Sequence, residues 1–174
     1  MKKISLIALG LLAAAQVHAA SDGGTINFSG IIKGQSCTVT VNNNATNLVS
    51  MPDIAASLLA EKSQTAGETN FTINLTDCST ATGDVLAYFE AGTNVNADGR
   101  LINNGTATNV ELELLDNAKR TPLVAGDLEQ QTGLTKVPLS EGAANMIYTA
   151  RYYATGKAEA GTVESSVTFS IHYL

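Results

Sequence analysis

The 174-residue chain contains no tryptophan, and aromatic residues make up only 5% of it. Charged residues are also scarce, at 15%, where an ordinary soluble domain carries about 25%. Scarce Glu, Lys and Arg argue against a helical bundle, and 44% hydrophobic residues argue against a disordered chain. One secreted all-β domain with a core of its own fits this composition.

The chain also lacks a run of basic residues. Its formal net charge is −6. If Lys2 and Lys3 are removed by processing, eight basic residues remain against 16 acidic ones, a net charge of −8. An acidic surface of this kind does not condense on phosphate backbones. We therefore expect neither nucleic acid nor an anionic membrane surface as a partner.

Long hydrophobic runs are absent as well, apart from an apolar stretch from Ile4 to Ala15 that follows a basic start. This stretch is too short to cross a bilayer but is typical of a secretory signal peptide. The small or medium residues Val17 and Ala19 occupy the two positions that a signal peptidase reads, so the sequence predicts a signal peptide over residues 1–19, cleaved after Ala19. Cleavage after Ala20 and an uncleaved anchor are the alternatives.

Only two cysteines are present, Cys37 and Cys78, separated by 41 residues. Two lone cysteines make a poor metal site, and the spacing of a CxxC redox motif is absent. In an oxidising compartment we expect them to form a structural disulfide. Closing a loop of this length is worth about 4 kcal/mol in the chain-entropy model.

No catalytic constellation is evident. Of the two histidines, His18 is removed with the signal peptide, and His172 has no evident nucleophile in the sequence around it. Glu111 and Glu113 share one face of a predicted strand, and we interpret them as part of a solvent-facing polar face rather than an acid–base pair. No phosphate loop, zinc spacing or calcium loop is present. We expect no catalytic residue, metal or cofactor, and hence no enzyme.

Alternating apolar and polar residues predict strands along most of the chain. The predicted strands cover residues 25–32, 37–41, 71–75, 85–89, 110–114, 146–154 and 163–173. The turn dipeptides Asp98-Gly99 and Asn104-Gly105 favour hairpins, and the only predicted helix is a short one over residues 54–61. Seven short strands separated by turn signals indicate an all-β Greek-key sandwich.

The two ends of this pattern are unusual. The first strand is flanked by glycine-containing segments on both sides, so it need not belong to its own sheet. The last strand runs to the C-terminus, and no sequence remains to cover its edge, although sandwiches protect their edges. The alternative is an ordinary first strand that folds into its own domain.

Several of these features occur together in one known family. They are the segment Gly24–Ile32 followed by Cys37, the second cysteine Cys78, and a last strand with Gly161 near its start and Tyr173 as penultimate residue. Over its whole length the chain resembles the subunits of chaperone–usher fimbriae, most closely the major pilins of type 1-like fimbriae.

The resemblance implies an incomplete immunoglobulin-like Greek-key sandwich that lacks its last strand and is completed by a donor strand from a neighbouring subunit. It implies a signal peptide over 1–19, a donor extension over 20–33 and the pilin domain over 34–174. The donor residues would be Gly24, Ile26, Phe28, Gly30 and Ile32, with Gly30 at a notch where a side chain would clash. The acceptor groove and chaperone contact would comprise Gly161, Val163, Val167, Phe169, Ile171, Tyr173 and Leu174. Gly161 as a turn glycine and Tyr173 as a plain core tyrosine remain alternatives.

The implied function is that of a structural subunit of an adhesive surface fimbria, which polymerises by donor-strand exchange after capping by a periplasmic chaperone. The implied partners are identical or related pilins, the chaperone, an outer-membrane usher, and host-surface receptors through the assembled fibre. A minor tip adapter or an adhesin that binds host glycans is the alternative. A secreted enzyme on the same scaffold is a third hypothesis, and the missing catalytic constellation counts against it.

Overall fold

The computed structural model describes residues 26–30, 34, 36–79 and 82–174. Residues 34–174 form one compact unit, hereafter the sandwich, and residues 1–33 are assigned to another unit. The predicted signal peptide over 1–19, together with Gly24 and Ile32, lies outside the described residues.

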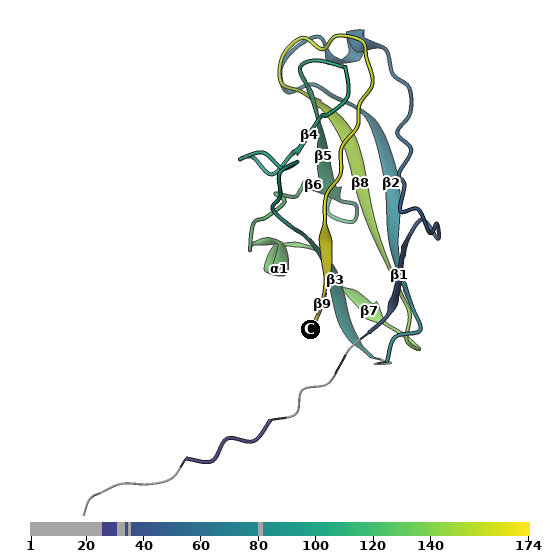
Figure 1. Cartoon of the computed structure of the whole chain (residues 1–174), viewed down its shortest axis with the longest axis vertical. Helices are drawn as coiled ribbons and strands as arrows, with labels where there is room; N and C mark the ends of the chain where they lie inside the picture. The colour runs from purple at the N-terminus through teal and green to yellow at the C-terminus, as the bar shows by residue number, and fades with distance from the viewer. Residues whose placement is uncertain (1–25, 31–33, 35, 80–81) are drawn as a thin grey trace, which may run out of the picture. The chain divides into compact units, whose positions relative to one another are not determined.

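The larger sheet of the sandwich is built around two long antiparallel strands, β2 (Thr65–Thr76) and β8 (Ala144–Ala154), which run side by side (Figure 1). β1 (Thr38–Val41) pairs with β2 on one side. On the other side β8 pairs with β5 (Val110–Asp116), which in turn pairs with β4 (Leu101–Ile102) and β6 (Thr121–Pro122). Their alternating apolar residues turn one face of this sheet toward the core.

The smaller sheet has the order β7–β3–β9, with β3 (Gly83–Phe89) between β7 (Val137–Leu139) and β9 (Phe169–Tyr173). Five successive residues of β3, from Val85 to Phe89, are buried, as expected of a central strand with a continuous apolar run. The predicted all-β sandwich is therefore confirmed.

The two sheets meet through a cluster of aromatic side chains. The ring of Phe89 from the smaller sheet lies edge-on to the rings of Tyr148 and Phe71 from the larger one, with centroids 5.0 and 6.4 Å apart. The Tyr148 hydroxyl accepts a hydrogen bond from the backbone N–H of Ala87 across the sandwich, at 3.1 Å. Burial raises the pKa of Tyr148 to about 12, so its hydroxyl remains protonated in this cross-sheet contact.

Three local predictions are wrong. The helix expected over 54–61 is a single 3₁₀ turn, η1 (Ala56–Leu59), and the one-turn helix α1 (Gln130–Gly133) was not predicted. The last strand, expected over 163–173, forms a ladder only within β9. Glu113, expected to face solvent, is buried and pairs with Arg151, because a neighbouring cation on β8 can cover a carboxylate on this face.

Candidate functional site

A long apolar groove opens between two segments that lie over the larger sheet. Its C-terminal wall is the segment 161–173, of which residues 161–169 line the groove, and its N-terminal wall is formed by residues 47–54. The groove consists of two adjoining hollows of about 460 and 650 Å³, which share Val49 and Met51. The floor carries core residues of the larger sheet, namely Phe71, Ile73, Val110, Leu112, Leu114, Ala150 and Tyr152. Part of the hydrophobic core is thus uncovered along the groove and could be covered by an added strand.

The C-terminal wall offers unpaired backbone groups to the groove. Toward β3, the carbonyl of Thr168 accepts from the N–H of Glu90 at 2.8 Å, and the N–H of Leu174 donates to the carbonyl of Asp84 at 2.9 Å. Successive residues of a strand direct their backbone N–H and C=O groups to opposite sides. The backbone groups of the odd-numbered residues from 163 to 173 therefore point away from β3, toward the groove side. Within the described residues, the backbone groups of 163, 165 and 167 have no hydrogen-bond partner.

Among the described residues the N-terminal wall also lacks a strand partner, although the Tyr152 hydroxyl donates to the carbonyl of Pro52 at 3.1 Å. Val49 and Met51 are half-buried over the floor, and Leu48 between β1 and Val49 is 64% exposed. No backbone–backbone hydrogen bond involves residues 48–53 in the part of the chain that the structure describes. Two open strand edges therefore face each other across an apolar floor, and one further strand would satisfy both.

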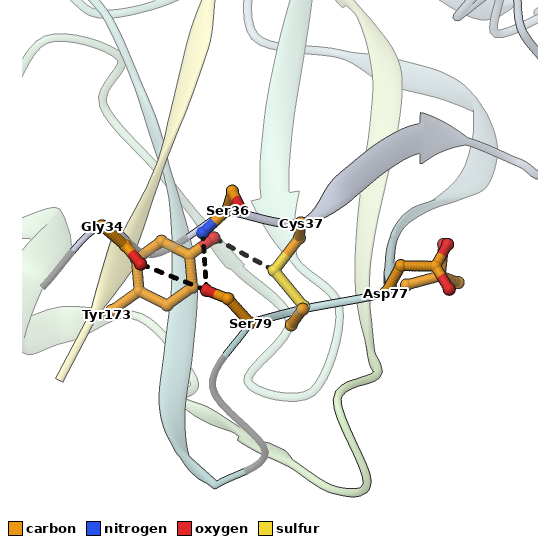
Figure 2. Close-up of a disulfide and its surroundings, with 8 residues drawn as sticks. Gly34, Ser36, Cys37, Asp77, Ser79 and Tyr173 are labelled. Atoms are coloured by element: carbon orange, nitrogen blue, oxygen red, sulfur yellow. Dashed lines mark hydrogen bonds between the residues drawn. A yellow bond between two sulfur atoms is a disulfide. The ribbon is translucent and has the colours of Figure 1, made fainter.

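Both ends of the groove are tied across its width. At one end the Tyr173 hydroxyl donates to Sγ of Cys37 at 3.1 Å, just before β1 (Figure 2). At the other end the N–H of Ala158 donates to the carbonyl of Leu59 at 2.9 Å. These contacts link the segments on the two sides of the groove near its two ends.

The predicted disulfide is present at the first of these ends. Cys37 and Cys78 are joined with an S–S distance of 2.05 Å. Beside it, the N–H of Ser36 donates to Oγ of Ser79 at 3.1 Å (Figure 2), and the N–H of Ser79 donates to the carbonyl of Ser36 at 2.9 Å. The start of the N-terminal segment is thereby held to the end of β2.

The structure brings most of the predicted acceptor residues together. Val163, Val167, Phe169, Ile171 and Tyr173 are half-buried along the C-terminal wall and pack against the core. Leu174 is 55% exposed and lies beyond the wall. Gly161 is not a turn glycine with a positive φ: a Cβ there would lie 2.3 Å from the backbone nitrogen of Ala107, so the position requires glycine for close approach.

Sequence reasoning missed the N-terminal wall, but the alternation of the last strand places Ser165 on the same face as the apolar residues of the C-terminal wall. Leu48, Val49 and Met51 lie in a stretch that carries few strand signals, and their alternation around Ser50 was the only available sign. Ser165 faces the core, and its hydroxyl is buried without a hydrogen-bond partner among the described residues. A buried hydroxyl of this kind ordinarily has a partner.

Three of the five predicted donor residues, namely Ile26, Phe28 and Gly30, lie within the described residues. The side chains of Ile26 and Phe28 are 77% and 92% exposed. A Cβ added to Gly30 would meet no atom within 4 Å. Large apolar side chains left this exposed have no role in the stability of their own domain and are suited to burial elsewhere.

The residues considered as candidate catalytic groups, His172 and Glu111, contact other side chains of the sandwich. The ring of His172 stacks on that of Tyr88, with centroids 5.2 Å apart. Glu111 pairs with Arg100 at 2.8 Å. Where the structure describes the chain, no group of His, Cys, Asp and Glu side chains could hold a metal ion. In the same residues, no helix is both long and apolar enough to cross a membrane.

Comparison with known proteins gives concordant matches over nearly the whole chain. A family described as "Fimbrial protein" matches residues 26–174. The chain is 39% identical to the major fimbrial subunit SMF-1 of Stenotrophomonas maltophilia (strain K279a), covering 94% of this chain and 99% of that protein. It is 37% identical to the F17 fimbrial protein of Escherichia coli, with 99% of each covered. In fold it is similar to the P pilus rod subunit PapA, with a TM-score of 0.57 at 15% identity, covering 86% of this chain and 100% of that one.

Proposed function

Because this chain belongs to the fimbrial protein family, whose subunits polymerise with related pilins into an extracellular fibre, we propose that it polymerises by donor-strand exchange. The chain is a structural subunit of a fimbria, and its fold is the incomplete immunoglobulin-like sandwich. Residues 20–33 of one copy fill the groove of the next. Relatives named major fimbrial subunits favour a fibre-forming subunit over a tip adhesin.

One observation carries this proposal: two unpaired strand edges face each other over an open part of the core. A strand laid between them would gain backbone hydrogen bonds on both sides. The same strand would bury Ile26 and Phe28, which are exposed in the free chain. Each such burial is worth about 1.5–3 kcal/mol.

The pattern of the donor residues suits the shape of the groove. The hollow beside residues 165–169 is lined mainly by apolar side chains, whereas the hollow beside residues 158–164 exposes a larger share of polar atoms. Ile26 and Phe28 would fill the more apolar hollow, Gly30 would lie where the two hollows adjoin, and Ile32 would enter the second. The donor would then run antiparallel to the C-terminal wall.

Before assembly the groove needs another occupant, because its edges would otherwise pair with any available strand. A periplasmic chaperone would supply that strand, with Tyr173 and Leu174 among its contacts, and an outer-membrane usher would exchange it for the donor. Export depends on the signal peptide over 1–19, which leaves 20–33 as the donor extension and 34–174 as the pilin domain.

Two matched glycine substitutions test the donor assignment. Gly30→Leu and Gly34→Leu make the same change four residues apart, and in the free chain neither added Cβ meets an atom within 4 Å. Any selective effect of Gly30→Leu must therefore arise in the neighbour's groove. We expect full-length Gly30→Leu chains to fold with unchanged thermal stability but to form few fibres, whereas Gly34→Leu chains assemble normally. Equal assembly by both variants would refute the donor assignment.

A further inference from the structure

The first half of the C-terminal wall, residues 161–166, is attached to the sandwich differently from the second half. β9 pairs with β3 in a regular ladder. Residues 161–166 instead lie along residues 103–107, hereafter the clamp loop, which connects β4 to β5. This half of the wall therefore depends on a loop for its position.

The side chain of Asn103 is the centre of that attachment. Its Oδ1 accepts hydrogen bonds from the backbone N–H groups of Gly105 and Glu164, both at 2.8 Å. Its Nδ2 donates to the carbonyl of Ala107 at 2.8 Å and, at 3.4 Å, to that of Thr162. One amide thus folds the clamp loop and holds the wall at the same time.

Other contacts extend this attachment along the wall. The N–H of Asn104 donates to the carbonyl of Glu164 at 2.7 Å, and the N–H of Ala107 donates to that of Thr162 at 3.0 Å. Thr106 and Thr162 exchange backbone-to-hydroxyl bonds at 3.1 and 2.9 Å. All of these bonds reach the even-numbered wall residues, so the odd-numbered ones remain free to face the groove.

The clamp joins the two sheets at the groove. The clamp loop belongs to the larger sheet, whereas the wall leads into β9 of the smaller one. On the groove side of this half, the backbone groups of Val163 and Ser165 have no partner in the described chain, and the Ser165 hydroxyl is also unpaired. An extended segment that is bonded on one side, here at Thr162 and Glu164, and open on the other is arranged to receive a strand.

We infer that Asn103 is a positioning residue for donor-strand uptake: it holds residues 161–166 extended and ready to pair with an incoming strand. This inference rests on the proposed function of the groove. Without Asn103 the N–H of Glu164 loses its partner, and the incoming strand has to order the wall as well as pair with it. Uptake should slow, while the chain's own extension, which lies outside the sandwich, remains a competent donor.

The variant Asn103→Ala tests this split between accepting and donating. A fluorescent peptide of residues 22–34 is added to the full mature chain, and we expect about tenfold slower uptake by the variant, since it loses the bond to Glu164 and the support of the loop. In mixtures with wild type, the variant should donate to wild-type grooves but accept poorly. It should therefore terminate growing fibres, and mean fibre length should fall as its fraction rises.

Asn117→Ala is the matched control. Asn117 makes two side-chain hydrogen bonds, to Asn70 at 2.9 Å and Thr149 at 3.0 Å, against four at Asn103, and neither of them reaches the C-terminal wall. Asn103→Asp keeps the acceptor of the Gly105 and Glu164 N–H groups but sets a carboxylate oxygen against the carbonyl of Ala107, so it should restore only part of the uptake rate. An Asn103→Ala chain that takes up peptide and elongates fibres as Asn117→Ala does would overturn the inference.

Two further outcomes are decisive. If Asn103→Ala does not fold, Thr106→Val removes the acceptor of the Thr162 N–H with little change in volume. Shorter fibres in mixtures with that variant would support the inference, and unchanged length would overturn it. If the wild-type chain itself takes up no peptide, the proposed function of the groove is wrong, which distinguishes that failure from failure at Asn103.

Discussion

Truncating Phe28 to alanine should weaken the fibre without weakening the subunit. The Phe28 side chain is 92% exposed in the free chain, so its own domain gains almost nothing from it. A phenylalanine buries about 200 Å², which at about 25 cal/mol per Å² sets an upper bound near 5 kcal/mol. Alanine retains part of this burial, so we expect a loss of about 3 kcal/mol per subunit contact. At 1.4 kcal/mol for each factor of ten, fibres should dissociate about a hundredfold more readily.

The assay compares dissociation of assembled fibres in guanidinium chloride with unfolding of the monomeric chain. Phe28→Ala fibres should release subunits at a lower denaturant concentration, while the unfolding midpoint of the monomer stays unchanged. Ser29→Ala, on the opposite face of the same strand, should alter neither. If Phe28→Ala fibres were as resistant as wild type, or if the monomer lost the same stability, Phe28 would not be a donor residue.

Two further predictions concern the sandwich itself. The Gln130 side chain is buried and exchanges hydrogen bonds with the backbone of Phe89 at 3.0 and 2.9 Å, and it also donates to the carbonyl of Val124 at 2.9 Å. Gln130→Ala should therefore lower the free energy of unfolding, measured in urea, by about 3 kcal/mol. The adjacent substitution Gln131→Ala should have little effect. Burial alone would raise the pKa of the Asp116 carboxyl, but hydrogen bonds donated by Thr135, Lys119 and Ala118 outweigh it and leave the pKa below the usual 3.8. The stabilising contribution of the Asp116 carboxylate to folding is complete above the pKa that this carboxyl has in the unfolded chain, and it is lost as pH falls through its lower pKa in the folded chain. Between pH 5 and pH 2 the wild type should therefore lose more stability than Asp116→Asn. Equal losses in the two proteins would contradict this role.

Residue patterning predicted the strands that carry most of the core. β3 and β8 were recognisable because their periodicity of burial follows directly from alternation or from a continuous apolar run. The short strands β4, β6 and β7 were not predicted. Two or three residues hold no periodic signal, and their pairing depends on neighbours distant in sequence.

The residues of the groove were likewise predicted only in part. Val163, Val167 and Phe169 of the C-terminal wall were predicted because they alternate within one long run. The opposite wall was missed because Val49 and Met51 are recognisable only from what they cover. Asn103 gave no signal either, since its bonds to Glu164 and Thr162 join segments about sixty residues apart. Asn-Gly at 104–105 indicated a hairpin, whereas Gly105 is in fact required for close approach to Thr162.

The two ties across the groove, from Tyr173 to Cys37 and from Ala158 to Leu59, also bear on how a fibre would carry load. If these ties close the groove into a slot at both ends, a strand would enter it from the side and not lengthwise. A seated strand that is pulled along its axis would run against an end of the slot instead of sliding to a new register. Tension would then be shared by all the hydrogen bonds of the strand at once, as in a joint loaded in shear, and separation would require the strand to be peeled out sideways, one residue after another.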